Sequence, residues 1–455
     1  MALSKEKILR YTSNNMIDIK SEQETKAKCL LIGSPEDKKT NGSSLKELCG
    51  LVDTMGMEVV KTLSLTHMEP NPAYGIGSGK VSEIEALAKE IFADCIIFDW
   101  ELDPRKQRNW EKLTGINCFD RNEVIIRIFA QRAQTKEAQL QVELAKLKYS
   151  LPRLSHTYGD LSRQRGGSYG TKGSGETQLE LDRRQIEDKI IQIKKELSQV
   201  KINRETQRKQ RERTKTASCA LVGYTNAGKS SLLNALTGAE AFVEDKLFAT
   251  LDPTTRKLSI SEGSSVLLTD TVGFISNLPH TLIESFKSTL EEASYADLLL
   301  IVVDAGDAHC KEQYTQVLKV LKEIDANKVN SIIVLNKIDK VKDDHEKLSE
   351  LNAYFPSSVK VSAKTQEGFE ELLESIKENL LGTESTFILP FNRTDLLENA
   401  RKGGTILNEE WLEDGIHFTA RIPGTISEEK DSLTDKVIKK ASTRTLALLM
   451  PYLVK

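Results

Sequence analysis

The sequence predicts an α/β protein in which a domain with a phosphate-binding loop follows a small parallel α/β subdomain and a long antiparallel helical arm. A small α+β domain comes last. Three observations predict this fold class. A strand-like run at 219–222 leads into the glycine-framed loop 223–230 and then into a helix. Residues 29–119 alternate short apolar runs with helical periodicity. Two stripes of apolar residues at helical spacing flank a glycine-rich stretch at 163–175.

The composition is that of a globular, multidomain protein. A chain of 455 residues is too long for one core, and we place the domains at 1–128, 129–215, 216–384 and 385–455. Hydrophobic residues make up 39% and charged residues 29% of the chain. Lys and Arg (64) nearly balance Asp and Glu (67), so affinity for nucleic acid has to come from local basic patches.

Cysteine usage and hydropathy predict a cytoplasmic protein, which we expect to be a monomer. The six cysteines are scattered without a C-x-x-C pair, which favours reduced thiols over disulfides or a zinc site. Residues 1–7 begin no apolar signal segment, and the strongest apolar run, 298–303, has only the length of a strand. We therefore expect no membrane span; a peripheral association with a membrane stays open.

The first subdomain is predicted from alternating strands and helices. Strands are expected at 29–33, 57–60, 95–98 and 116–119, and helices near 44–55, 79–92 and 103–114. Between them, the glycine-rich segment 74–81 invites comparison with a nucleotide motif. Its spacing does not fit, because Val81 stands where a hydroxyl is needed and Tyr74 where the first glycine is needed. The pattern favours a flexible loop over a second phosphate site.

The arm is predicted from two apolar stripes that can face each other. The first comprises Ala133, Leu140, Leu144, Leu147 and Leu151; the second comprises Leu179, Ile186, Ile190, Ile193, Leu197 and Val200, with steps of four and three. The stretch 163–175 between them is basic and lacks a packing pattern. We expect it to contact RNA through Arg163, Arg165 and Lys172, since a solvated linker would not need two long helices. For the basic run 201–215, a phosphate-facing stripe and a solvated face are equally good interpretations.

The loop 223–230 fits the pattern G-x-x-x-x-G-K-[ST] at every position. Gly223 and Gly228 allow the turn and the close approach of main chain to phosphate. Lys229 can reach the β and γ oxygens, and the Ser230 hydroxyl can coordinate Mg²⁺. The loop N–H groups, at the start of a helix, converge on an anion.

Three later motifs follow at strand ends and predict a guanine nucleotide. The first ends a strand in Asp270-Thr271-Val272-Gly273, which places a carboxylate beside Mg²⁺ and a glycine N–H at the γ-phosphate. In the second, 336–339, the Asp339 carboxylate can accept hydrogen bonds from guanine N1–H and N2–H₂ together, a pair that adenine lacks. The third, 361–364, offers a backbone N–H to guanine O6. Ligands of such sheets bind at the carboxyl ends of the strands, so the four motifs predict one site.

Several of these motifs together resemble the HflX branch of the P-loop GTPases. The similarity rests on 223–230, 248–256 (Phe-Ala-Thr-Leu-Asp-Pro-Thr-Thr-Arg) and 270–274 in the nucleotide domain. It also rests on arm motifs that other GTPases do not share, at 141–144, 152–154, 173–180 and 182–184. The resemblance covers residues 28–384. It implies a Mg²⁺-dependent P-loop GTPase that binds the large ribosomal subunit and its RNA, inserts its arm towards the peptidyl-transferase region, and separates stalled or idle ribosomes.

The resemblance also implies roles for individual residues. Lys229, Thr250 and Gly273 are the implied catalytic residues, and Ser230 and Thr250 the implied Mg²⁺ ligands. The implied GTP-binding residues are Gly223, Tyr224, Thr225, Asn226, Ala227, Gly228, Lys229, Ser230, Phe248, Ala249, Thr250, Leu251, Asp252, Asp270, Thr271, Val272, Gly273, Asn336, Lys337, Ile338, Asp339, Ser362, Ala363 and Lys364.

The sequence departs from the family pattern in the arm tip, which is one residue longer, and residues 385–455 look like a small appendage that some members carry. Two other functions stay open: a ribosome-assembly GTPase like Obg, and an RNA-binding protein that GTP merely stabilises. Phe274 stands where Ras-like GTPases place the glutamine that orients the attacking water, so we expect slow hydrolysis by the free protein.

Overall fold

The structure is a computed structural model that describes residues 26–35, 43–69, 71–154, 174–213, 217–238, 246–261, 264–276, 290, 292–382, 384–422 and 448–454. The chain divides into two compact units, Met1–Ile125 and Ile126–Lys455. No helix within the described residues combines the length and apolar character needed to cross a membrane.

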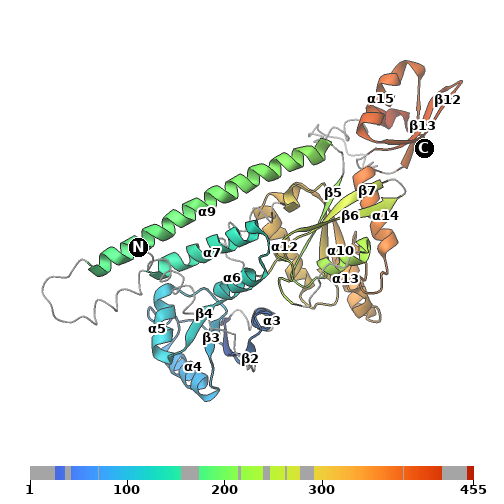
Figure 1. Ribbon diagram of the computed structural model, residues 1–455. Coiled ribbons are helices and arrows are strands. Elements are labelled where there is room, and N and C mark those ends of the chain that lie inside the picture. The colour runs from blue at the N-terminus through green and yellow to red at the C-terminus, as the bar shows by residue number, and fades with distance from the viewer. Residues whose placement is uncertain are drawn as a thin grey trace, which may run out of the picture. The chain divides into compact units, whose positions relative to one another are not determined.

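The first unit is built on a four-stranded parallel sheet with the order β2-β1-β3-β4 (Figure 1). Leu30 and Ile32 of β1 pack with α4 and α5 in one apolar cluster, while α3 contacts β1 and β2 with separate buried residues. The predicted parallel subdomain is confirmed. Its elements are β1 (Lys28–Gly33), α3 (Ser43–Thr54), β2 (Glu58–Ser64), α4 (Ser78–Glu90), β3 (Cys95–Phe98), α5 (Pro104–Thr114) and β4 (Asn117–Asp120), and α6 (Arg121–Arg132) continues into the second unit.

The glycine-rich segment 74–81, predicted as a flexible loop, is a loop only at 74–77, and that loop is packed rather than loose; residues 78–81 form the first turn of α4. Ile76 is buried, and the Tyr74 ring meets the Trp110 ring edge-on at 5.3 Å between centroids. The Trp110 Nε1–H donates to the Tyr74 carbonyl at 3.2 Å. Lys80, the cation of the apparent motif, pairs with Glu83 on its own helix at 2.6 Å. The glycines therefore shape a turn that α5 holds in place.

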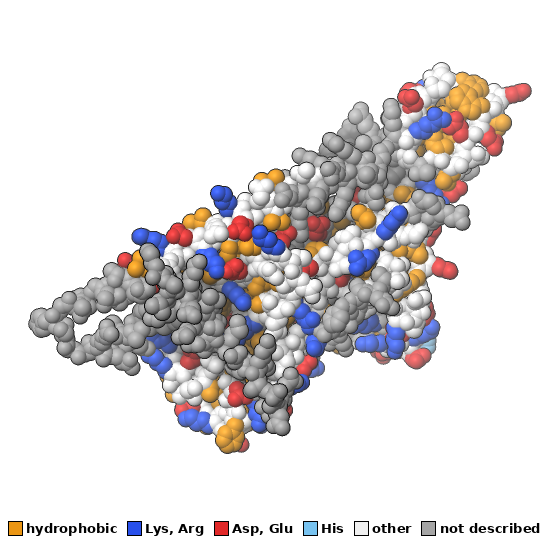
Figure 2. Space-filling model, in the orientation of Figure 1, with side chains coloured by type: hydrophobic (Ala, Val, Ile, Leu, Met, Phe, Trp, Pro, Cys, Tyr) orange, Lys and Arg blue, Asp and Glu red, His pale blue; other side chains and the backbone are white. Residues whose placement is uncertain are grey.

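The arm consists of α7 (Lys136–Leu154) and the forty-residue α9 (Ser174–Arg213), which lie side by side in Figure 1. The predicted stripes meet in one cluster of Leu140, Leu144, Ile190 and Ile193, and this confirms the antiparallel pairing of the two helices. Over the described face of the arm, Lys and Arg side chains are intermixed with Asp and Glu (Figure 2). Arg163, Arg165 and Lys172, the expected RNA contacts, lie outside the described residues.

The nucleotide domain has a six-stranded sheet with the order β10-β9-β8-β5-β7-β6, in which only the β6–β7 pair is antiparallel. Cys219, Leu221, Leu300 and Val334 supply much of its core, as their apolar runs predict for strands covered on both faces. Its elements are β5 (Ser218–Gly223), α10 (Lys229–Thr237), β6 (Thr254–Ser261), β7 (Ser264–Asp270), β8 (Leu298–Asp304), α12 (Cys310–Glu323), η1 (Ala326–Lys328), β9 (Asn330–Asn336), η2 (Ile338–Lys340), α13 (His345–Tyr354), β10 (Val359–Lys360) and α14 (Phe369–Leu381).

The last part of the chain is the predicted small α+β domain. An antiparallel sheet with the order β11-β13-β12 packs against α15, and Phe387 stacks on Phe418 in its core at 5.2 Å between centroids. Its elements are β11 (Glu384–Leu389), η3 (Phe391–Arg393), α15 (Thr394–Gly403), β12 (Thr405–Leu412), β13 (Gly415–Arg421) and η4 (Met450–Tyr452).

The six cysteines are free, as expected, and all but Cys49 are buried. Burial raises the pKa of the Cys118 thiol and of the Cys219 thiol to about 12 each. These side chains therefore act as small core residues.

Candidate nucleotide-binding site

The phosphate-binding loop joins the end of β5 to the start of α10, where the motif requires it. Gly228 has φ +89°, and a Cβ there would lie 2.3 Å from Asn336 Nδ2. A Cβ on Gly223 would lie 2.3 Å from the Val302 carbonyl oxygen. Both positions need glycine because neighbouring strands already occupy the space of a side chain.

Lys229 is buried beneath this loop. Its Nζ donates to the Tyr224 carbonyl at 2.8 Å and to the Gly223 carbonyl at 3.2 Å. Burial lowers the pKa of Lys229 to about 8, although the nearby Asp270 carboxylate opposes the change. A Cβ on Gly273 would come within 3.0 Å of Nζ and 2.9 Å of Thr225 Cα, so Gly273 leaves room for a ligand oxygen between them. An ammonium so placed suits the β and γ oxygens of a nucleotide.

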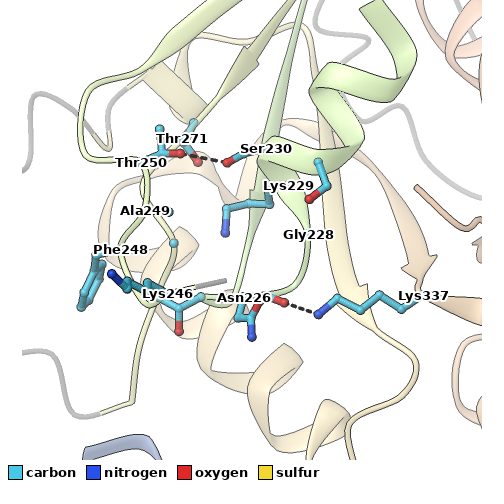
Figure 3. A pocket seen from close by; sticks show the side chains of 13 residues that line it. Asn226, Gly228, Lys229, Ser230, Lys246, Phe248, Ala249, Thr250, Thr271 and Lys337 are labelled. Atoms are coloured by element: carbon cyan, nitrogen blue, oxygen red, sulfur yellow. Dashed lines mark hydrogen bonds between the residues drawn. The ribbon is translucent and has the colours of Figure 1, made fainter. Parts of the chain in front are cut away.

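Two hydroxyls and a carboxylate from three segments converge beside Lys229. Ser230 Oγ and Thr250 Oγ1 are 2.8 Å apart (Figure 3), and Ser230 Oγ donates to Asp270 Oδ2 at 2.5 Å. Burial raises the pKa of Asp270, while Lys229 and the two hydroxyls act against that change. The buried Asp270 Oδ1 has no hydrogen-bond partner among the described residues. Hard oxygen ligands with one unsatisfied carboxylate oxygen fit Mg²⁺, which takes its other ligands from water and phosphate.

The Thr225 hydroxyl is a second buried polar group in the same situation as Asp270 Oδ1. Thr225 Oγ1 is buried without a hydrogen-bond partner in the described part of the chain, and the residue lines the same pocket as Lys229, Ser230 and Gly273. A buried hydroxyl of this kind usually has a partner. A phosphate oxygen in the pocket would supply one.

The motifs expected to bind the base are joined to the phosphate-binding loop by hydrogen bonds. Asn336 Nδ2 donates to the Ala227 carbonyl at 2.9 Å, and Asn336 Oδ1 accepts from Ala363 N at 3.1 Å. Ser362 Oγ donates to Asp339 Oδ1 at 2.6 Å, which orients the carboxylate expected to bind guanine. The Asn336 side chain thus links its own segment to those of Ala227 and Ala363, a role that its motif alone does not reveal.

Lys337 crosses from the base-binding motif to the loop. Its Nζ donates to the Asn226 carbonyl at 2.6 Å, the second dashed contact in Figure 3, and pairs with Asp304 at 2.8 Å. The stem of Lys337 therefore lies where a base can rest on it. Lys246, which sequence reasoning missed, lines the same pocket together with Ser231. Only its position two residues before Phe248 could have suggested it.

Some of the predicted GTP-binding residues do not line the pocket: Gly223, Tyr224, Ala227, Leu251, Asp252, Asp270, Val272, Asn336, Ile338, Asp339, Ser362, Ala363 and Lys364. Phe274 is buried and does not line the pocket; its N–H donates to the Gly223 carbonyl at 3.0 Å, and its carbonyl accepts from Thr225 N at 2.7 Å. Its side chain is not placed to orient a water molecule. Asp252 also lies outside the pocket lining, and its carboxylate accepts from Gln134 N at 3.0 Å.

Comparisons with known proteins decide the family. The chain is 42% identical over 424 residues to a GTPase HflX of Caldanaerobacter subterraneus subsp. tengcongensis, and the alignment covers 92% of this chain and 95% of that protein. The chain belongs to the HflX family of GTPases. A GTPase HflX of Escherichia coli K12 is 39% identical over 383 residues, 83% of this chain and 89% of that protein.

Three family models agree with this membership. Three models match: the GTP-binding GTPase N-terminal region at 42–130, the GTP-binding GTPase middle region at 132–211 and a 50S ribosome-binding GTPase at 218–337. A crystal structure of SsGBP in complex with GDP is 28% identical, covering 77% of this chain and 98% of that one, with a TM-score of 0.47. The family membership and the model matched at 218–337 show that the chain is a GTPase, and they confirm the expected P-loop GTPase fold.

Proposed function

We propose that this HflX-family GTPase uses Mg²⁺ and GTP to bind the large ribosomal subunit and its RNA, and that it separates stalled or idle ribosomes in the cytoplasm as a monomer. The family membership supports this function, and so does the match of residues 218–337 to a model described as a 50S ribosome-binding GTPase.

The arm is the observation that carries the proposal. The cluster of Leu140, Leu144, Ile190 and Ile193 holds two helices together, and α9 alone is about 60 Å long at 1.5 Å per residue. The pair ends at Leu154 and Ser174, on either side of the segment with Arg163, Arg165 and Lys172. Arginine and lysine among glycines suit the phosphates of RNA.

The nucleotide site explains how GTP would be held for hydrolysis. Mg²⁺, when bound by Ser230 and Thr250 with Asp270 behind them, would neutralise charge between the β- and γ-phosphates. Lys229 and the loop N–H groups bind the phosphate oxygens. Because Phe274 offers no hydrogen-bonding side chain, we infer that the large subunit orders the 248–256 and 270–280 segments and supplies or positions the polar group that aligns the attacking water.

Light scattering of purified ribosomes tests the splitting activity. We expect scattering to fall when the protein is added with GTP or with a non-hydrolysable analogue, which would mean that binding drives the separation. No fall with either nucleotide would contradict the proposal and favour an assembly factor or a static RNA-binding protein.

Two matched triple variants test the arm tip. Replacing Arg163, Arg165 and Lys172 with Ala should reduce co-sedimentation with large subunits and leave nucleotide affinity unchanged. The control replaces the exposed Lys319, Lys322 and Lys328 with Ala. These lysines lie outside the arm, and replacing them removes the same charge. Equal binding by both variants would show that the tip carries no ribosome affinity.

Phosphate release tests the role assigned to the ribosome in hydrolysis. The free protein should turn over slowly, and large subunits should raise kcat well above that basal rate. A fast free enzyme that large subunits do not accelerate would contradict this part of the proposal.

A further inference from the structure

Asp252 connects the nucleotide-sensing segment to the base of the arm. Its Oδ2 accepts hydrogen bonds from two consecutive main-chain N–H groups just before α7, those of Gln134 at 3.0 Å and Thr135 at 3.2 Å. The Thr135 hydroxyl donates to the other carboxylate oxygen and accepts from Ala138 N at 3.1 Å. The carboxylate thus binds donors at the N-terminal end of the helix, where negative charge is stabilised.

A second contact lies at the other end of the same segment. The Phe248 ring meets the Phe129 ring of α6 edge-on, with 4.6 Å between centroids and 79° between planes. Phe248 is buried and has φ +55°, a conformation that a bulky residue keeps only when its surroundings hold it. Phe248 also lines the nucleotide pocket. Phe248 therefore both lines the pocket and contacts the helix that leads into the arm.

The central residue of the segment faces the predicted metal site. Thr250 Oγ1 lies 2.8 Å from Ser230 Oγ, while Asp252, two residues later, holds the start of α7. Two residues span at most about 7 Å, so a shift of Thr250 by several ångströms strains the short backbone that joins it to Asp252. The inward position of Thr250 and the Asp252–α7 contact occur together in this structure.

We propose that segment 248–252 couples the γ-phosphate to the arm, with Asp252 as the positioning residue at the base of α7. GTP holds Thr250 inward and so favours the Asp252–α7 contact; loss of the γ-phosphate releases both. Coupling is reciprocal, so the contact raises the preference of the site for GTP over GDP. The inference extends the GTPase activity and does not depend on ribosome splitting.

The orientation of a long helix is sensitive to such a contact at its base. At 1.5 Å per residue α7 is about 28 Å long, and a tilt of about 5° at its start displaces its far end by about 2.5 Å. Because α9 packs along α7, the displacement carries the paired helix with it. A small change at the γ-phosphate thereby reaches the end of the arm.

Nucleotide affinities of the full-length free protein test the coupling. Asp252→Ala and Thr135→Ala should each lower the preference for a non-hydrolysable GTP analogue over GDP by about five- to tenfold, a typical coupling. The double variant should lose no more of this preference than either single variant does, because both changes break the same contact. Asp252→Asn should recover part of the preference, since an Asn oxygen still accepts from a helix N-terminus.

A matched control separates coupling from ordinary helix capping. Asp103 caps α5 in the first unit, where its Oδ1 accepts from Arg105 N at 2.9 Å. Asp103→Ala removes a comparable helix cap and should leave the GTP-to-GDP preference unchanged. If Asp103→Ala and Asp252→Ala change the preference equally, or the two single changes at Asp252 and Thr135 add, the proposal fails.

Hydrogen exchange gives a direct measure at the arm. In the wild type, the amides at 133–140 should exchange more slowly with the GTP analogue than with GDP, because Asp252 accepts from two of them. The difference should vanish in Asp252→Ala and persist in Asp103→Ala. Equal exchange rates at 133–140 with the GTP analogue and with GDP in the wild type would overturn the proposal, whatever the ribosome assays show.

Discussion

Ser362→Ala isolates the contribution of a buried hydroxyl to guanine recognition. Ser362 is fully buried, and its Oγ donates to Asp339 Oδ1 at 2.6 Å while accepting from Thr365 N at 3.1 Å. The substitution leaves the Asp339 carboxylate without this donor and free to turn towards solvent. The base must then re-orient it on binding.

The magnitude follows from the chemistry of the contact. A hydrogen bond to a charged group contributes about 1.5–3 kcal/mol, and Asp339 is only half-buried, so water can replace part of what is lost. We therefore expect a loss near the lower end of that range, which corresponds to a rise of about tenfold in Kd. The rise should be equal for GTP and GDP, because both nucleotides present the same base.

Fluorescence titration with labelled GDP and a labelled GTP analogue measures the effect, and urea unfolding measures stability. Ser358→Ala is the matched control: its Oγ donates to the Phe355 carbonyl at 2.7 Å, away from the nucleotide. Both variants should lose about 1 kcal/mol of unfolding free energy, but only Ser362→Ala should lose affinity. Wild-type affinity in Ser362→Ala, or an equal loss in Ser358→Ala, would refute the reasoning.

Three further predictions concern the same site. Gly228→Ala should weaken GTP and GDP binding by about 30-fold or more, because a Cβ at φ +89° adds about 1–2 kcal/mol of strain and meets Asn336 Nδ2 at 2.3 Å; near-normal titration would contradict this. Ser230→Ala should abolish the gain in GTP affinity that Mg²⁺ gives the wild type, measured with and without a chelator, and a gain that persists would rule out Ser230 as a ligand. Asp339→Asn should weaken GTP by about 1–3 kcal/mol and admit xanthosine triphosphate, whereas equal binding of ATP and GTP by the wild type would refute guanine recognition through Asp339.

Much of the fold was predictable because its signals are local. The four strands of the first unit and the paired stripes of the arm follow from apolar periodicity, which reports how each segment buries its own surface. The loop before α4 shows the limit of such patterns. Its glycines predicted a flexible segment, but the ring and the N–H of Trp110, 36 residues away, hold Tyr74 in place.

The site, too, has features that the sequence predicted and features that it did not. Gly223, Gly228, Lys229 and Ser230 belong to one short loop, so their spacing was enough to predict a phosphate site. The order of strand-end motifs predicted guanine, because the carboxyl ends of parallel strands meet at one edge. The local sequence around Asn336 did not reveal that its amide joins Ala227 to Ala363.

The partner of each remaining polar group is set by how distant segments pack. Asp252 belongs by sequence to the segment expected to sense the γ-phosphate, yet its carboxylate binds main-chain groups at Gln134 and Thr135, 118 and 117 positions earlier in the chain. A motif records which chemistry a residue offers. Packing decides which donors lie within 3 Å of a carboxylate, and here it brings the start of α7 to Asp252 while keeping that side chain out of the nucleotide pocket.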